Sequence, residues 1–360
     1  MKIVTVVGAR PQFIKAAPVS RVLRSSGHRE FLVHTGQHYD YGMSRIFFEE
    51  MGIPDPDVNL GVGSGAHGEQ TGNMIIGIEK VLLSEKPDLV LVYGDTNSTL
   101  AGALAAVKLH IPLAHVEAGL RSFNREMPEE HNRVLTDHCA DLLFCPTKTA
   151  VHNLSAEGIR RGIHLVGDTM YDAVLHFSDI AKHRSTILDC LKLKPKEYLL
   201  ATIHRPSNTD SPKRLQEILR ALVHIQTPVI FPIHPRTRKR IAEIERGIDS
   251  DIKKSLLRII DAVGYLDMLV LEQNARLILT DSGGIQKEAF FFKVPCVTLR
   301  TETEWVETVE SGWNVLAGSE YSSILEKVNI MQTRRGKDDS FFGNGDASSK
   351  ILEVIQRQFN

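Results

Sequence analysis

Short apolar runs rich in β-branched residues alternate with longer segments of helical periodicity along the whole chain. Amphipathic segments such as 96–109 and 211–225 separate these runs. Strands that are apolar on both faces and alternate with helices are typical of parallel sheets covered on both sides. The pattern therefore predicts an α/β fold. The predicted strands are residues 2–7, 30–35, 88–94, 112–116, 142–146, 164–167, 198–204, 228–234, 257–261, 276–280 and 296–300.

The number of predicted strands favours two domains over a single sheet. So many strands exceed the usual width of an open twisted sheet, and we expect two Rossmann-like, doubly wound domains facing a cleft. Segment 168–185 is the expected connecting helix, and the last helix, about 346–359, is expected to pack back on the first domain. The predicted N-terminal domain is 1–168 with residues 346–360. The predicted C-terminal, nucleotide-binding domain is 169–345.

The bulk composition narrows the classes of function. Of 360 residues, 42% are hydrophobic and 24% charged, and the formal net charge is -1. Such a chain has no global field that would attract nucleic acid or an anionic membrane, so we expect neither partner. No apolar run approaches the ~20 residues of a membrane span. The start, MKIVTVVGARPQF, lacks the pattern of a signal peptide, so we predict a cytoplasmic protein. The four cysteines lack CxxC spacing, which argues against a disulfide framework or structural zinc.

Polar or glycine residues follow nearly every predicted strand. In open parallel sheets, ligands bind beyond the carboxyl ends of the strands, so these residues predict two half-sites facing each other across a cleft. They are Gly8-Ala9-Arg10, Gln37-His38, Gly94-Asp95-Thr96, Glu117, His204-Arg205, His234-Pro235-Arg236 and Asp281-Ser282-Gly283-Gly284.

The sequence TDSGGIQKEAF (280–290) follows a predicted strand and opens a helix. Ser282, Gly283 and Gly284 would present free amides at the positive end of the helix dipole, which favours a phosphate or diphosphate. A plain N-cap is the alternative. Glu288 lies about one and a half turns further on, at a distance that suits a ribose hydroxyl.

The sequence GARPQFIKAA (8–17) lies at a similar junction. Arg10 and Lys15 fall in the first turns of a helix, where a cation opposes the helix dipole. A bound anion would explain them, and a surface arginine with its stem on the sheet is the alternative. By contrast, GSGAHG (63–68) matches GxGxxG but follows a loop-like stretch. We therefore predict a glycine-rich loop over the cleft there, and no nicotinamide cofactor.

The stretch AHVEAGLRSFNREMPEEHNRVLTDH (114–138) is unusually rich in charge. Its second half predicts a helix over 127–140, with Glu129, Arg133 and Asp137 on one stripe. We expect the other stripe to be buried and its histidines to be core residues, so we predict no metal site. That stripe contains His131, Val134, Leu135, His138 and Cys139.

Three carboxylates, Asp95, Glu117 and Glu129, fall at ends of the same predicted sheet. A helix N-terminus alone would explain Glu129. Carboxylates grouped in a cleft serve proton transfer on both faces of a substrate. His204 ends the first strand of the second half and is either a structural or a site residue. The sequence has no GxSxG, Walker A or HExxH motif, which argues against common hydrolase and ATPase chemistry.

Several blocks together resemble the non-hydrolysing UDP-N-acetylglucosamine 2-epimerases over most of the chain. They are GARPQFIKAAP, HTGQHYD, VYGDTNSTLAG, HVEAGLRSFNREMPEEHNR, HLVGDTMYDA, HPRTR and LTDSGGIQKEA. The resemblance implies a GT-B fold, a UDP-sugar substrate, no cofactor and a homodimer. It also implies an isomerase that inverts C2 by anti elimination of UDP and re-addition, in the synthesis of surface polysaccharide or O-antigen precursors.

The resemblance also implies a set of site residues. Arg10 and the amides at 282–284 would hold the phosphates, with Lys15 nearby. Glu288 would hold the ribose, and His204 would lie near the leaving diphosphate. The implied catalytic residues are Asp95, Glu117, Glu129 and His204. The implied UDP-sugar ligands are Arg10, Lys15, Gln37, His38, Gln70, Arg133, His234, Ser282, Gly283, Gly284 and Glu288.

The chain departs from the common family pattern at Gln12, Pro206 and Asp168, which stand in GARPQ, HRPS and GDT where many members have GTRPE, HRRE and GNT. The variants GARPQ, VGDTMYDA and TEWVETVESGWN (303–314) resemble the branch that includes UDP-2,3-diacetamido-2,3-dideoxyglucuronate 2-epimerases. The resemblance thus implies either UDP-N-acetylglucosamine or that acidic sugar as the substrate. The acidic sugar would need an extra cation, for which the candidates are Arg121, Arg125 and Arg300.

Three other functions stay open. A GT-B glycosyltransferase would keep the nucleotide residues but would need an acceptor. A sugar-nucleotide sensor would bind UDP without exchanging the C2 proton. A hydrolysing epimerase would release UDP and free N-acetylmannosamine.

Overall fold

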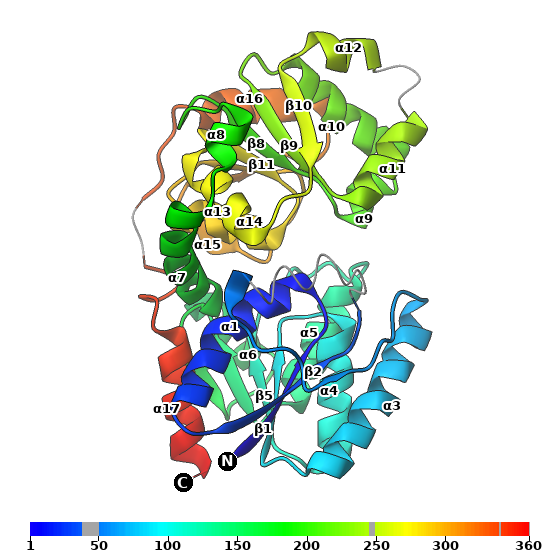
Figure 1. The fold of residues 1–360 in the computed structure, drawn as a ribbon, viewed down its shortest axis with the longest axis vertical. Helices are drawn as coiled ribbons and strands as arrows, with labels where there is room; N and C mark the ends of the chain where they lie inside the picture. The colour runs from blue at the N-terminus through cyan, green and yellow to red at the C-terminus, as the bar shows by residue number, and fades with distance from the viewer. Residues whose placement is uncertain (38–49, 245–248, 338–339, 360) are drawn as a thin grey trace. The chain divides into compact units, whose positions relative to one another are not determined.

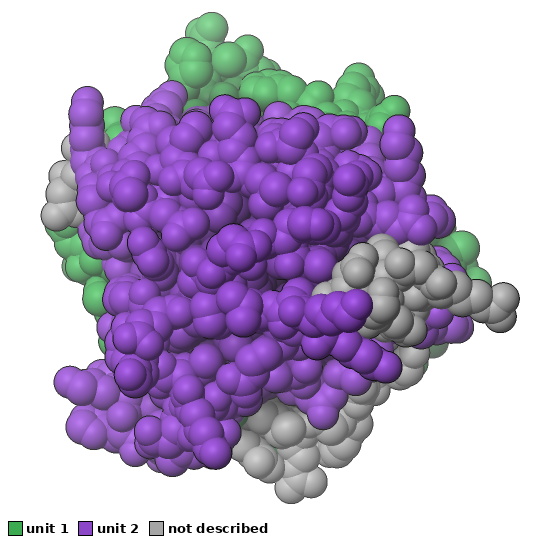
Figure 2. Space-filling model, turned by 90° about the horizontal axis from the view of Figure 1, so that it is seen from above, with its two compact units in different colours: residues 1–176, 340–360 green, residues 177–339 purple. Residues whose placement is uncertain are grey.

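The computed structural model describes residues 1–37, 50–244, 249–337 and 340–359. The chain forms two compact units, drawn in green and purple in Figure 2. Unit 1 comprises 1–176 and 340–360, and unit 2 comprises 177–339. The domain bounds predicted from the sequence stay a prediction, because compactness alone does not define a folding unit.

Unit 1 is built on a seven-stranded parallel sheet of order β3-β2-β1-β4-β5-β6-β7. Alternate residues of the central strands, such as Val4, Val6, Val90 and Val92, pack in one apolar cluster with the helices α3 and α4. The strands are β1 Lys2–Val7, β2 Arg29–His34, β3 Val58–Asn59, β4 Leu89–Tyr93, β5 Leu113–Val116, β6 Leu142–Cys145 and β7 Ile163–Leu165. The helices are α1 Arg10–Ser25, α3 His67–Glu85, α4 Asn97–Lys108, α5 Pro128–Cys139, α6 Lys148–Ala156, α7 Thr169–Arg184, which runs on into unit 2, and α17 Ala347–Phe359.

The last helix of the chain packs against the first. Helix α17 lies beside α1 in unit 1 (Figure 1). Its start is fixed by Asp172 of α7, whose carboxylate accepts the amides of Ala347 and Ser348 at 3.1 and 2.7 Å. A carboxylate at this position satisfies amides that the helix itself leaves open.

Unit 2 is built on a six-stranded parallel sheet of order β10-β9-β8-β11-β12-β13. Both faces of the sheet are covered, because Leu199 and Ala201 of β8 pack in one apolar cluster and Leu200 packs in another. The strands are β8 Leu199–Thr202, β9 Val229–Ile233, β10 Leu257–Asp261, β11 Leu277–Thr280, β12 Cys296–Thr298 and β13 Asn314–Leu316. The helices are α8 Ile187–Leu191, α9 Pro206–Thr209, α10 Pro212–His224, α11 Pro235–Ile244, α12 Asp249–Lys254, α13 Tyr265–Asn274, α14 Gly283–Phe291, α15 Val306–Glu310 and α16 Tyr321–Met331.

The α/β class with two doubly wound parallel sheets is confirmed. Each predicted strand is present within a few residues, and β3 and β13 were not predicted. The expectation that 63–68 follows a loop was wrong in one respect, because the short strand β3 precedes it and α3 begins at His67. However, β3 is an edge strand, and the central strand β1 is followed by the single glycine Gly8. No helix in the described part of the chain is long and apolar enough to cross a membrane.

Candidate active site

The end of β4 and the start of α4 position Asp95 in unit 1. Gly94 adopts φ +63, a left-handed turn that glycine takes without strain, and the Thr96 side chain caps α4. The Asp95 carboxylate accepts a hydrogen bond from Nη2 of Arg133. Its carbonyl oxygen accepts Nδ2 of Asn132 at 3.0 Å. Asp95 is therefore held from α5 through both its backbone and its side chain.

Glu117 follows β5, the neighbouring strand in the sheet. It has φ +72, an uncommon value for a residue with a side chain and a mark of local backbone strain. Its carboxylate pairs with Nζ of Lys15 from α1, and both side chains are buried. Lys15, expected near a phosphate, thus holds a predicted catalytic carboxylate.

The buried face of α5 is polar, and the predicted assignment of its faces was wrong. His131, Leu135 and His138 are exposed. Hydrophobic periodicity failed here because the buried polar side chains satisfy one another through ion pairs and hydrogen bonds instead of packing on apolar surface. The buried residues are Glu130, Asn132, Arg133, Thr136 and Asp137. Glu129 is half-buried in the first turn of the helix.

A second polar network lies under the strand ends of unit 1. His115 of β5 contacts Asp137 and the carbonyl oxygen of Gly94, at 2.7 Å each. Arg121 donates to Asp137 at 2.7 Å and forks onto Glu157 at 2.6 and 2.7 Å. Burial acts to raise the pKa of Asp137, but hydrogen bonds and charge from His115 and Arg121 outweigh it and hold that pKa below its usual value.

The start of α4 also gathers two predicted ligands, Gln37 and Gln70. Gln37 accepts Oγ of Ser98 at 2.6 Å. Gln70 accepts Nδ2 of Asn97 at 2.8 Å, and Asn97 in turn accepts Nδ2 of Asn132 at 3.1 Å. The structure therefore brings Gln37 and Gln70 to the same helix end as Asp95. His38 lies outside the described residues.

Two residues of the β1–α1 junction complete this edge. Gln12 accepts the amides of Gly8 and Ala9 at 2.8 and 3.0 Å and donates to the carbonyl of Tyr93 at 2.9 Å. An amide can both accept and donate, so it ties β1 to β4 where a carboxylate could only accept. Burial lowers the pKa of Arg10 to about 10, with Glu50 opposing the shift. Arg10 therefore gives a partly desolvated cation at the start of α1.

Asp281 organises the strand ends of unit 2. It is fully buried and accepts the amides of His204 and Arg205 at 3.1 and 3.0 Å and Nδ2 of Asn208 at 3.1 Å. His204 keeps its half-exposed ring with Nδ1 3.5 Å from Asp281. Pro206 begins α9, where its fixed φ suits the first helical position.

Ser282 is the N-cap of α14, accepting the amide of Ile285 at 3.5 Å. The N-cap alternative is therefore present, and it is compatible with an anion at the same helix end. A Cβ at Gly283 would lie 2.3 Å from Oε1 of Glu304 and 3.1 Å from Nε1 of Trp305, so a larger residue there would require the Glu304 side chain to move. Glu304 is held by Arg300 at 2.9 Å. The first turn of α14 thus already faces charged and polar groups.

Glu288 is deeply buried, with 3% of its surface exposed, and accepts the hydroxyl of Tyr265 at 3.0 Å. Glu272 of α13 lies beside it, fully buried. Burial, and then the neighbouring Glu288, raise the pKa of Glu272 well above its usual value. His234, by contrast, is exposed at the end of β9. The predicted ribose ligand is therefore one half of a buried carboxyl pair that the sequence did not indicate.

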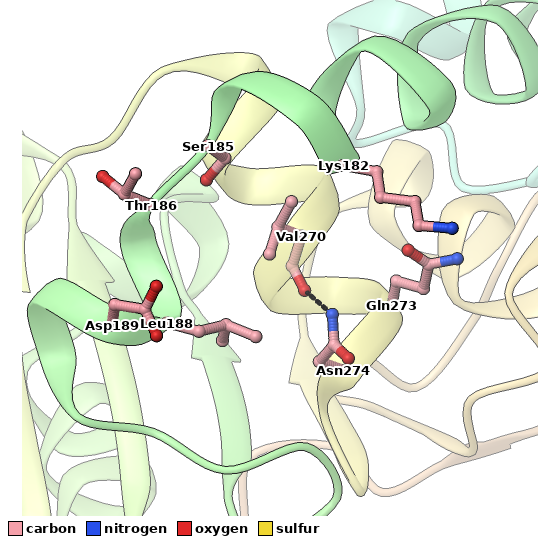
Figure 3. A pocket seen from close by; sticks show the side chains of 8 residues that line it. All are labelled: Lys182, Ser185, Thr186, Leu188, Asp189, Val270, Gln273 and Asn274. Atoms are coloured by element: carbon pink, nitrogen blue, oxygen red, sulfur yellow. Dashed lines mark hydrogen bonds between the residues drawn. The ribbon is translucent and has the colours of Figure 1, made fainter.

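The described residues contain no cluster of His, Cys, Asp and Glu that could hold a metal ion. A surface pocket of unit 2 is lined by α7, α8 and α13 residues and shares none of the predicted site residues (Figure 3). Its lining residues are Lys182, Ser185, Thr186, Leu188, Asp189, Val270, Gln273 and Asn274.

Comparison with known proteins gives a consistent picture. A model of the UDP-N-acetylglucosamine 2-epimerase family matches residues 21–356. A UDP-N-acetylglucosamine 2-epimerase homolog of Methanococcus maripaludis is 56% identical over 99% of both chains. The UDP-2,3-diacetamido-2,3-dideoxy-D-glucuronate 2-epimerase of Pseudomonas aeruginosa is 51% identical over 99% of this chain and 100% of its own. The structure of Methanocaldococcus jannaschii UDP-GlcNAc 2-epimerase in complex with UDP-GlcNAc and UDP matches with a TM-score of 0.94 and 47% identity, covering 99% and 100% of the two chains.

Proposed function

The chain belongs to the UDP-N-acetylglucosamine 2-epimerase family, and we propose that it inverts C2 of a UDP-N-acetylhexosamine by eliminating UDP and adding it back. It is an enzyme that epimerises C2 of a UDP-sugar. We further propose the roles of individual residues, the identity of the sugar and the biological setting.

The reaction needs no oxidant, because the C1–O and C2–H bonds that break in the elimination form again in the re-addition. The C1–O bond to the diphosphate breaks and its electron pair leaves with UDP. A base takes the C2 proton, and that electron pair forms the C1=C2 bond of a 2-acetamidoglucal. An acid then delivers a proton to the opposite face of C2 as UDP adds back at C1. This chemistry demands two proton-handling groups and stabilisation of the leaving anion.

The observation that carries the proposal is the pair of carboxylates at neighbouring strand ends in unit 1. Asp95 follows β4 and is held by Arg133, and Glu117 follows β5 and is held by Lys15. Glu129 adds a third, half-buried carboxylate from the first turn of α5. We assign these three residues to the acid and base steps.

Unit 2 supplies the nucleotide residues of the proposal. The first turn of α14, at Ser282, Gly283 and Gly284, offers amides to the diphosphate, since a helix N-terminus favours anions. Glu288 takes the ribose hydroxyls. His204, whose backbone is fixed by Asp281, stabilises the leaving diphosphate. Arg10 of unit 1, with Gln37, His38, Gln70 and His234, completes the set assigned to UDP-sugar binding.

The names of the relatives point to two sugars, N-acetylglucosamine and a diacetamido-glucuronate. An arginine that binds the glucuronate carboxylate would distinguish the two. Arg121 is engaged by Asp137 and Glu157, and Arg300 by Glu302 and Glu304. Arg125 is exposed in the loop before α5. Of the three candidate cations, Arg125 is therefore our choice for the carboxylate of a glucuronate-type sugar. Replacing it with alanine would then raise KM for the acidic sugar and leave turnover of UDP-N-acetylglucosamine unchanged.

The direct test is to incubate the protein with each UDP-sugar in the absence of any acceptor and to follow products by NMR. The proposal expects a mixture of gluco and manno UDP-sugars with no free hexosamine. Free N-acetylmannosamine together with UDP would indicate a hydrolysing enzyme. Nucleotide release that depends on an added acceptor would indicate a glycosyltransferase, and UDP binding without turnover a sensor.

The setting that fits this activity is the cytoplasm, where UDP-sugars would be supplied to the synthesis of surface polysaccharide or O-antigen precursors. A homodimer is the expected assembly. Light scattering of the purified protein tests the dimer, and a mass of one chain, 40.2 kDa, would contradict it.

A further inference from the structure

His115 of β5 lies under the two strand ends that carry the proposed acid and base residues. Its side chain is fully buried. Nδ1 lies 2.7 Å from Oδ1 of Asp137, and Nε2 lies 2.7 Å from the carbonyl oxygen of Gly94. Gly94 immediately precedes Asp95, and His115 is two residues before Glu117. Nothing in the proposed chemistry uses this histidine.

Nε2 of His115 has to be a hydrogen-bond donor. The carbonyl oxygen of Gly94 only accepts, so Nε2 must carry hydrogen. On the other side of the ring, Oδ1 of Asp137 contacts Nδ1, while Oδ2 accepts the amide of Gly119 at 3.1 Å and Nη1 of Arg121 at 2.7 Å. The ring is therefore held at both of its nitrogens.

Asp137, the partner of His115 on α5, is itself held in place. Arg121 from the loop after β5 donates to Asp137 and forks onto Glu157 at the end of α6, and Glu157 also lies 3.4 Å from Nε2 of His138. The side chains of Arg121 and Asp137 are buried, so moving Asp137 away from His115 would break a buried ion pair, which is costly.

We infer that His115 positions the Gly94–Asp95 turn, through its hydrogen bond to Gly94, relative to the strand end that carries Glu117. His115 does not contact the substrate in this account. It acts as a positioning residue, since a displacement of about 1 Å in a catalytic group can cost roughly 100-fold in rate. The functional part of this inference rests on the proposed roles of Asp95 and Glu117.

The hydrogen bond from Nε2 can be read directly by NMR of the full chain labelled with ¹⁵N-histidine. His115 is identified as the ring signal that disappears in His115→Gln. Its Nε2 is expected to give the resonance of a nitrogen that carries hydrogen, because it donates to the carbonyl oxygen of Gly94. A signal from Nε2 without hydrogen would overturn the inference, whatever the enzyme's substrate.

The positioning role is tested by kinetics of His115→Gln, because glutamine cannot bridge Asp137 and Gly94 together. The account expects kcat to fall by about 100-fold while KM and the affinity for UDP stay unchanged. The matched control is His152→Gln, an exposed histidine of α6, which should behave as wild type. An unchanged kcat, or equal losses of kcat and UDP affinity, would contradict the role. If wild type itself shows no epimerisation, the proposed function fails, and the NMR result still decides whether Nε2 of His115 donates to Gly94.

Discussion

Arg133, buried in α5, holds the carboxylate of Asp95 at the end of β4. Its Nη2 donates to Asp95, and Nη1 donates to Glu130 at 2.9 Å in the same helix. Only 2% of the Arg133 surface is exposed, so this guanidinium is a buried cation between two acids. The fork geometry of arginine lets it serve both carboxylates at once.

Removing this cation should destabilise the protein strongly. Arg133→Ala leaves two carboxylates without their partner and is expected to lower the free energy of unfolding by about 3–5 kcal/mol. Arg133→Lys should lose less, because lysine keeps the charge without the fork. Urea unfolding measures both. Arg276→Ala, at an exposed arginine before β11, is the control. Arg133→Ala as stable as that control would refute the account of this pair.

Glu117→Gln tests the proton transfer step itself. The change keeps the shape of the side chain and removes its basicity, so kcat should fall about 10²- to 10⁴-fold. The affinity for UDP, measured by calorimetry, should stay near that of wild type because Glu117 is assigned no contact with the nucleotide. Glu353→Gln, at an exposed position of α17, is the matched control. A Glu117→Gln enzyme with full activity would remove Glu117 from the acid and base set.

Gly283→Ala tests the assigned diphosphate site. The added methyl would meet Oε1 of Glu304 at 2.3 Å, so the Glu304 carboxylate, which pairs with Arg300, has to move and the first turn of α14 changes its surroundings. UDP affinity should weaken by about tenfold or more, the equivalent of losing roughly one hydrogen bond to a charged group. Gly72→Ala in α3 is the control, since its Cβ meets nothing within 4 Å. Unaltered UDP binding in Gly283→Ala would place the diphosphate elsewhere.

Glu272 should make stability depend on pH. Burial and the neighbouring Glu288 raise its pKa well above the usual value of 4.5. The folded state then binds a proton more tightly than the unfolded state, so the stabilising effect is complete below the ordinary glutamate pKa and is lost as pH rises towards the raised pKa.

Glu272→Gln keeps a neutral, hydrogen-bonding side chain at every pH. The free energy of unfolding of Glu272→Gln minus that of wild type should therefore increase from pH 5 to pH 8, as measured by urea unfolding at both values. Glu310→Gln, at an exposed glutamate, should show no such change. A difference between Glu272→Gln and wild type that is the same at both pH values would mean that Glu272 is already ionised in the folded protein.

The fold was largely predictable because its central strands are buried on both faces and so give continuous apolar runs. The two strands that were missed, β3 and β13, are two and three residues long and lie at sheet edges. The faces of α5 were misassigned for a different reason. Its buried face carries charged side chains, which a sequence pattern assigns to the protein surface. Their burial can be predicted only when the positions of their partners, here Asp95 and Arg121, are known.

The site was predictable only to the extent that strand ends mark it. Asp95, Glu117 and His204 follow strands and were found that way. Other features of the site join residues far apart in the chain. They are the hydrogen bond between Asn97 and Asn132, the ion pair of Lys15 with Glu117, and the burial of Glu272 beside Glu288. No local pattern reports such contacts, because each depends on how helices pack on the sheet.

Exchange of the C2 proton is the most direct test of the central claim. The purified protein is incubated in D2O with UDP-N-acetylglucosamine and, separately, with UDP-2,3-diacetamido-2,3-dideoxyglucuronate, and the C2 proton is followed by NMR. Elimination and re-addition predicts that this signal disappears from at least one UDP-sugar while its manno epimer accumulates with deuterium at C2. Retention of the C2 proton in both sugars would contradict the account.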